Sequence, residues 1–273
     1  MTGRSQPIQV AKIRGNLRET VDDRVAVEEP LEIRLGYEQS GERHTQSISI
    51  TMRTPGDDED LALGFLFTEG VLSSLDDIAI VKPCTGDNTI RVELEASVRV
   101  NLERLQRHFY TTSSCGVCGK ASLDALQVQG VTRLPENDCM FSRTAIVGFP
   151  EQLRSAQETF DETGGLHAAA AFDSNGELIV VREDVGRHNA VDKVIGVLLS
   201  EGRLPARSTG LMVSGRASFE LMQKTLVSGM PLLAAVSAPS SLAVELAREF
   251  NVTLIGFLRG DNFNIYAGEE RIA

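Results

Sequence analysis

The chain has 273 residues, a hydrophobic content of 42%, a formal net charge of -11 and no tryptophan. At ~150 residues per domain, this length predicts one large or two ordinary domains. The negative charge argues against nucleic acid as a partner, because a phosphate backbone would be repelled. Neither a signal-peptide core nor a run of ~18 apolar residues is present, so we expect a cytoplasmic protein outside the membrane.

The first part of the chain is predicted to be rich in β-strands. Apolar and polar residues alternate over 31–35, 47–52 and 90–94. Each alternating run is typical of a strand with one face in water. A helix is expected between the second and third strands, because the acidic residues 57–60 favour a helix N-terminus and Gly70 favours a C-terminus.

The second part alternates between strands and helices. A helix is expected after Phe149-Pro150, and a turn at 173–176 joins the first two strands that follow. The alternation predicts a mixed sheet that contains parallel strands and carries helices on both faces. The predicted strands are 168–172, 178–181, 210–213, 232–236 and 252–257, and the predicted helices are 187–199, 217–227 and 240–250.

The most distinctive short motif pairs Cys115 with Cys118 in the stretch TTSSCGVCGK, residues 111–120. Its small, polar and glycine residues predict an exposed, mobile loop. A zinc half-site would need a second pair of ligands, and Cys84 and Cys139 lie at irregular distances from the motif. A thioredoxin-like redox pair, two incidental cysteines and a nucleophilic thiol that accepts persulfide sulfur are the other interpretations. The residues alone leave these alternatives open.

Three polar turns follow predicted strands in the second part of the chain. Arg187 and His188 lie in the first turn, and Gly215 with Arg216 begins a predicted helix in the second. Strand ends and helix N-termini are common sites for anions, so the three turns together predict a phosphorylated or nucleotide-like ligand. The competing interpretation of the first turn is a helix cap by Asp184 with surface charges behind it. The turns span residues 182–193, 214–218 and 257–266.

Four motifs in this order identify a resemblance: the cysteine loop, TGGLH at 163–167, REDVGRHNAVDK at 182–193 and SGR at 214–216. The chain resembles the formate dehydrogenase accessory sulfurtransferases, the FdhD family, from about residue 54 to residue 266. The resemblance implies an α+β and α/β two-domain fold. A small β-rich domain (1–110) would be joined by a connector with the mobile loop (111–140) to a cytidine-deaminase-like α/β/α domain with a mixed sheet (141–273).

The resemblance also implies a function. The protein would accept persulfide sulfur from a cysteine desulfurase and pass it to the molybdenum (or tungsten) bis(molybdopterin guanine dinucleotide) cofactor of formate dehydrogenase. Cys115 would carry the sulfur, with Cys118 as a helper, in a homodimeric sulfurtransferase. The alternatives are a cofactor-binding chaperone without sulfur transfer and a thiol–disulfide oxidoreductase. The guanine-nucleotide-containing cofactor, bound as a substrate, is expected at Phe257, Leu258, Arg259, Gly260, Asp261 and Asn262.

Zinc deaminases, whose fold the resemblance implies, use the signature H-x-E followed by P-C-x-x-C. We align His167 with the histidine of this signature, which places Ala169 where the acid–base glutamate would stand. Ser240 and Ala243 then replace the two zinc thiols. We therefore expect no zinc and no resident metal, and a residual pocket that holds a purine.

Overall fold

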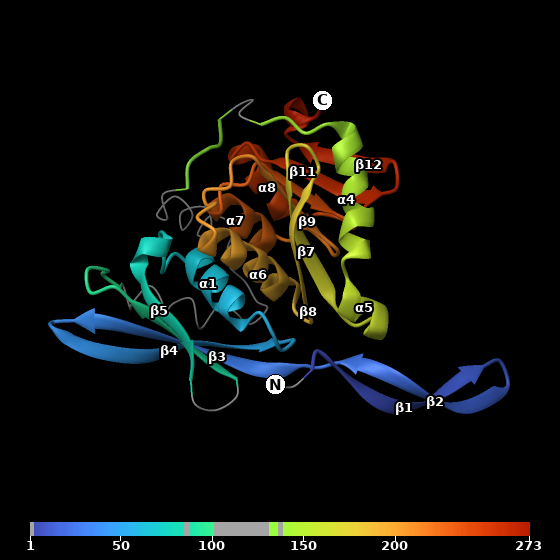
Figure 1. The fold of residues 1–273 in the computed structure, drawn as a ribbon. Helices are drawn as coiled ribbons and strands as arrows, with labels where there is room; N and C mark the ends of the chain where they lie inside the picture. Colours follow the sequence, from blue (N-terminus) through green and yellow to red (C-terminus); the bar gives the residue numbers. More distant parts are fainter. Residues whose placement is uncertain (1–2, 85–87, 101–130, 136–138) are drawn as a thin grey trace.

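The computed structural model describes residues 3–84, 88–100, 131–135 and 139–273 (Figure 1). It contains a six-stranded sheet in the order β12-β11-β10-β9-β7-β8, a four-stranded sheet in the order β4-β3-β6-β5, and the hairpin β1-β2. This is a mixed α/β architecture, as predicted. The predicted likeness to cytidine deaminases and the predicted domain boundaries stay predictions.

The six-stranded sheet is mixed. Strands β9, β10 and β11 are parallel, whereas β7 pairs antiparallel with both β8 and β9. Strand β8 therefore runs in the same direction as β9–β11, and the carboxyl ends of these four strands share one edge with the start of β7. The strands are β7 (His167–Asp173), β8 (Leu178–Asp184), β9 (Thr209–Val213), β10 (Leu232–Ala235), β11 (Thr253–Arg259) and β12 (Asn262–Ala267).

Helices cover both faces of this sheet (Figure 1). Helix α4 (Arg143–Ser155) packs on the face that includes Ala168 and Ala170. Helices α6 (Arg187–Ser200), α7 (Phe219–Val227) and α8 (Ser241–Glu249) pack on the face that includes Ala169 and Ala171. This division follows from the period of two along a strand, which sends neighbouring side chains to opposite faces.

Helix α1 (Asp58–Thr68) follows the four-stranded sheet's strand β4 and packs against α6. A Cβ atom at Gly64 or at Gly196 would overlap the backbone of the facing helix, so the two helices touch backbone to backbone there. One hydrophobic cluster runs from Leu31 and Ile33 through this contact into the large sheet. The strands are β3 (Glu29–Gln39), β4 (Glu42–Arg53), β5 (Ile78–Pro83) and β6 (Thr89–Leu94).

The structure corrects the predicted start of α4. This helix begins at Arg143, not after Pro150, which lies inside it. The hydroxyl of Ser142 accepts a hydrogen bond from the N–H of Ala145 at 3.0 Å and caps the helix. Ile146, Phe149 and Leu153 then share one buried face, and this packing outweighs the hydrogen bond that the proline cannot donate.

Strands β1, β2, β5 and β12 were not predicted. Hairpin β1 (Ser5–Arg14) and β2 (Leu17–Ala26) extends away from the body in Figure 1 and is mostly exposed. It is attached near α5 (Glu158–Thr163), where Arg24 contacts Glu162 at 3.1 Å. The stretch 257–266, predicted as a polar turn, consists of the end of β11, a tight turn and the edge strand β12. Short 3-10 helices lie at Leu75–Asp77 and Glu269–Arg271.

Helices long and apolar enough to cross a membrane do not occur in the described part of the chain.

Candidate anion-binding site at the strand ends

The carboxyl ends of β8, β9, β10 and β11 bring the predicted polar turns to one edge of the large sheet. Backbone hydrogen bonds connect the loops: Ser237 N donates to Gly215 O, and Phe257 N donates to Ser237 O, each at 3.2 Å. Ser214 joins the start of β7 to this edge, because its hydroxyl accepts from the N–H of Ala168 at 2.9 Å. We call this set of loops the strand-edge site.

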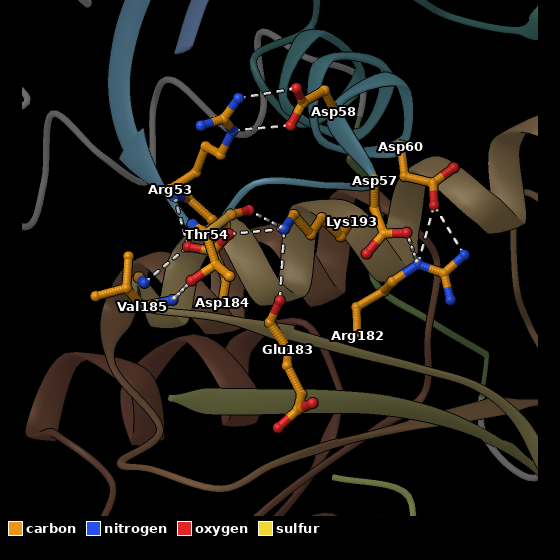
Figure 2. Close-up of polar contacts among 12 residues, drawn as sticks. Arg53, Thr54, Asp57, Asp58, Asp60, Arg182, Glu183, Asp184, Val185 and Lys193 are labelled. Atoms are coloured by element: carbon orange, nitrogen blue, oxygen red, sulfur yellow. Dashed lines mark hydrogen bonds and ion pairs between the residues drawn. The ribbon is translucent and has the colours of Figure 1, made fainter. Parts of the chain in front are cut away.

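Most charges of the 182–193 motif bind partners within the protein, and Figure 2 shows the contacts of Arg182, Asp184 and Lys193. Arg182 binds Asp60 on α1 through two hydrogen bonds of 2.9 and 2.8 Å. The carboxylate of Glu183 accepts the N–H groups of Thr159 and Phe160 at the start of α5. The alternative of surface charges behind a cap is therefore wrong for these residues, since they hold α1 and α5 in place.

Asp184 and Lys193 form the buried centre of the same motif. Their charged atoms are 2.8 Å apart, and both side chains are almost fully buried. Asp184 also accepts the N–H of Gly186 at 2.8 Å, which fixes the turn that leads into α6. The predicted helix cap by Asp184 is wrong: the N-cap residue of α6 is Gly186, and no side chain caps the helix. Asp184 instead holds the preceding turn as part of a buried ion pair.

Arg187 and His188 begin helix α6 at the strand-edge site. Burial lowers the pKa of His188 to about 4, and the positive charges of Lys224 and Arg187 act in the same direction. His188 is therefore neutral near pH 7. Within the described residues, Arg187 Nε and His188 Nε2 are buried atoms without a hydrogen-bond partner. Both atoms are therefore already desolvated, and each still has the capacity for a hydrogen bond.

His167 lies next to this pair, at the start of β7. Burial lowers the pKa of His167, and the positive charge of Arg187 lowers it further. Its ring faces Gly215, where an added Cβ would lie 3.7 Å from His167 Nδ1. The half-buried imidazole thus lines the strand-edge site and is not enclosed in the apolar core.

Two α7 residues near His188 were missed by sequence analysis. Glu220 Oε2 lies 3.9 Å from His188 Nε2. One turn further along, Lys224 Nζ binds Asp192 of α6 at 2.8 Å and the hydroxyl of Thr68 at 2.9 Å. The sequence did contain a signal for this contact. His188 and Asp192 are four residues apart, as are Glu220 and Lys224, and this spacing places the two members of each pair on one helix face.

The opposite end of the strand-edge site is formed by β11 and its turn. Arg259 is exposed and its Nε donates to Val236 O at the end of β10, at 3.3 Å. Phe257 has a positive φ of 54° and is 42% exposed, whereas the Leu258 side chain is buried in the α4 cluster. Of the six residues predicted to contact the cofactor, Leu258 is therefore fully buried. The turn residues Gly260, Asp261 and Asn262 are exposed.

Cys115 and Cys118 lie outside the described residues. Cys139 is buried among the residues under α4, and Cys84 is half-buried after β5. Among the residues that the structure describes, no three His, Cys, Asp or Glu side chains are arranged to hold a metal ion.

The residues aligned with the zinc-deaminase signature occupy other roles. Ala169 is buried in β7. Ser240 caps α8, because its hydroxyl accepts the N–H of Ala243 at 3.3 Å. Arg216, which follows Gly215, is exposed beside the start of α7.

Comparison with known proteins links this arrangement to one family. The sequence profile of the FdhD/NarQ family matches residues 26–273. A protein named Sulfur carrier protein FdhD from Mycolicibacterium paratuberculosis is 54% identical, over 91% of this chain and 91% of its own length. A protein of the same name from Streptomyces coelicolor is 50% identical, over 97% of this chain and 94% of its own. A solved structure from Desulfotalea psychrophila, assigned as a formate dehydrogenase accessory protein, is similar with a TM-score of 0.78 and 26% identity, covering 99% of this chain and 100% of that one.

Proposed function

The chain belongs to the FdhD/NarQ family, and from this premise we propose that it is a sulfur carrier required for the maturation of formate dehydrogenase. The observation that carries the proposal is the similarity to proteins named Sulfur carrier protein FdhD. It extends over more than nine-tenths of both chains at about half identity. The range matched by the family profile, residues 26–273, spans the cysteine motif, the three polar turns and both sheets.

The carrier in this proposal is Cys115, and its sulfur comes from a cysteine desulfurase. The Cys115 thiolate attacks the outer sulfur of the desulfurase persulfide, a new S–S bond forms, and the desulfurase cysteine leaves as a thiolate. Lys120, close by in the sequence, favours the thiolate form of the attacking cysteine. Cys118 helps to release the sulfur or shields the persulfide.

The acceptor is the molybdenum or tungsten bis(molybdopterin guanine dinucleotide) cofactor, bound as a substrate. The S–S bond of the Cys115 persulfide breaks, Cys115 leaves as a thiolate, and the sulfur becomes a ligand of the metal, which supplies two electrons. No metal resident in the protein takes part. The cytidine-deaminase-like pocket implied by the resemblance would hold the guanine base.

The strand-edge site is the proposed place of the acceptor. Arg187 and Arg216 lie at the starts of α6 and α7, and Arg259 lies at the end of β11. The ends of β8 and β11 are four strand spacings of ~4.8 Å apart, roughly 19 Å. A single phosphate cannot span this distance, whereas an extended dinucleotide can. Phe257, Arg259 and the turn that follows supply one end of the site.

The partners in this proposal are a cysteine desulfurase and formate dehydrogenase, and the carrier acts as a cytoplasmic homodimer. Three cysteine variants test the function in cells that depend on the protein for formate dehydrogenase activity. Cys115→Ala should abolish maturation, Cys118→Ala should reduce it, and the control Cys84→Ala should leave it unchanged.

The same variants separate the alternatives. Normal maturation with Cys115→Ala would contradict sulfur transfer and favour a cofactor-binding chaperone. Complete loss with Cys118→Ala, together with a reversible Cys115–Cys118 disulfide during turnover, would favour a thiol–disulfide oxidoreductase.

A further inference from the structure

The end of the four-stranded sheet reaches the strand-edge site through Thr54, which follows β4. This residue is 1% exposed. Its hydroxyl accepts the N–H of Val185 at 3.1 Å, its own N–H donates to Asp184 Oδ2 at 3.2 Å, and its carbonyl accepts from Lys193 Nζ at 3.1 Å. Thr54 thus binds the end of β8, the connection that follows it and helix α6, through its side chain and both backbone polar groups, as Figure 2 shows.

Asp184 receives hydrogen bonds from both sides of this junction. Besides Thr54 N, its carboxylate accepts Gly186 N at 2.8 Å, Asn189 Nδ2 at 3.0 Å and Lys193 Nζ at 2.8 Å. Asn189 in turn donates to Met52 O of β4 at 2.8 Å. A carboxylate with this many partners in a buried place allows little freedom to the turn that it holds.

The connection that Thr54 holds ends directly at the strand-edge site. Val185 and Gly186 immediately precede Arg187 and His188, so a shift of this turn moves both side chains at the start of α6. The large sheet alone does not fix the turn, because the bond to the Val185 N–H comes from Thr54 of the other sheet. Thr54, next to the four-stranded sheet, therefore acts together with Asp184 to fix the first turn of α6.

We propose that Thr54 is a positioning residue for the strand-edge site: it places Arg187 and His188 for phosphate binding without touching the ligand. This inference rests on the proposed function, because it takes the strand-edge site as the place of the nucleotide-containing cofactor. It adds a role for the four-stranded sheet, which would control the affinity of a site built mainly on the other sheet.

The rival explanation is that Thr54 only stabilises the fold, and a matched control separates the two. Thr253 is also fully buried, and its hydroxyl makes one hydrogen bond, to Gly268 O at 2.7 Å. It lies at the start of β11, at the opposite edge of the large sheet. Thr→Val at either position removes one buried hydroxyl and conserves the shape of the side chain.

The experiment uses the full chain and GDP, which carries the guanine base and two phosphates of the cofactor. Dissociation constants are measured for wild type, Thr54→Val, Thr54→Ser and Thr253→Val, at a temperature where all four are folded. Amide hydrogen exchange is measured for the peptide that contains Val185 and Gly186. We expect Thr54→Val to weaken GDP binding about five- to tenfold, the equivalent of one lost hydrogen bond. Amide hydrogen exchange at Val185 should be faster in Thr54→Val than in wild type. Thr54→Ser should restore both the GDP affinity and the exchange rate of wild type.

Thr253→Val should lose similar stability and keep GDP affinity within about twofold of wild type. Equal weakening by both valine variants, or unchanged affinity with Thr54→Val, would overturn the positioning role. Failure of wild type to bind GDP would instead contradict the proposed acceptor site. In that case the exchange rates still decide whether Thr54 holds the connection.

Discussion

Lys193 on α6 and Asp184 at the end of β8 form an ion pair of 2.8 Å with side chains only 1% and 0% exposed. Removing one member of a buried pair leaves an uncompensated charge in the protein interior. We therefore expect Lys193→Met to lower the free energy of unfolding by about 3–5 kcal/mol. The control Lys82→Met breaks a surface pair with Glu93 of 3.9 Å and should cost less than about 1 kcal/mol. Equal losses in urea denaturation would contradict this account of the buried pair.

The contact between α1 and α6 depends on two glycines. Because a Cβ at Gly64 or Gly196 would overlap backbone that cannot move aside, either Gly→Ala variant must push the helices apart. We expect each to destabilise the protein by about 3 kcal/mol or more. The added Cβ of Gly148→Ala in α4 meets no atom closer than 3.5 Å. This variant should raise the free energy of unfolding by about 0.5–1 kcal/mol, because alanine is more stable than glycine inside a helix. Thermal denaturation should therefore show a lower melting temperature for Gly64→Ala and Gly196→Ala, and a higher one for Gly148→Ala.

The low pKa of His188 makes stability depend on pH in a defined direction. Burial and the nearby Lys224 and Arg187 reduce it from 6.5 to about 4, so the unfolded chain binds this proton more tightly than the folded protein does. The resulting loss of folding stability is absent above pH 6.5 and grows as the pH falls towards 4. Wild type should therefore lose more stability on acidification than His188→Gln, which lacks the titrating imidazole. Parallel stability curves for the two proteins would contradict the shift.

Phosphate binding at the strand-edge site predicts a salt-sensitive affinity for GDP. Arg187→Gln and Arg259→Gln should each weaken binding about five- to tenfold, because charge-assisted hydrogen bonds are lost, and should reduce the dependence on salt. Arg154→Gln is the control, since Arg154 lies on α4 and pairs with Asp161. Calorimetric titration at two salt concentrations distinguishes the outcomes. Similar weakening by all three variants would point to a general effect of charge, and would contradict a site at this edge.

Sequence patterns predicted the parts of the fold where local periodicity and packing agree. The alternation in 31–35 and 90–94 predicted β3 and β6, and the strand–helix order predicted the mixed sheet and the edge where Arg187 and Arg259 lie. Pattern analysis failed where a helix cap and tertiary packing decide. Pro150 suggested a helix start, but the cap at Ser142 and the buried face of α4 place the start earlier.

The candidate site shows the same limit. Arg187 and His188 were predicted at the strand-edge site. The sequence did not show that Arg182, Glu183 and Asp184 of the same motif have structural roles instead. Their partners come from α1, α5 and β4, which lie far away in the sequence. A dense polar motif can be recognised from one chain, but its division into structural and ligand-facing residues requires the tertiary contacts.

The central claim, that Cys115 carries sulfur, is tested most directly by mass spectrometry of the intact protein and its peptides. The protein is incubated with a cysteine desulfurase and free cysteine, and the peptide that contains Cys115 is analysed before and after reduction. The account predicts an added mass in steps of roughly 32 Da on Cys115, removed by a reducing agent, because a persulfide is a reversible thiol modification. An unmodified Cys115 peptide in the presence of an active desulfurase would contradict it.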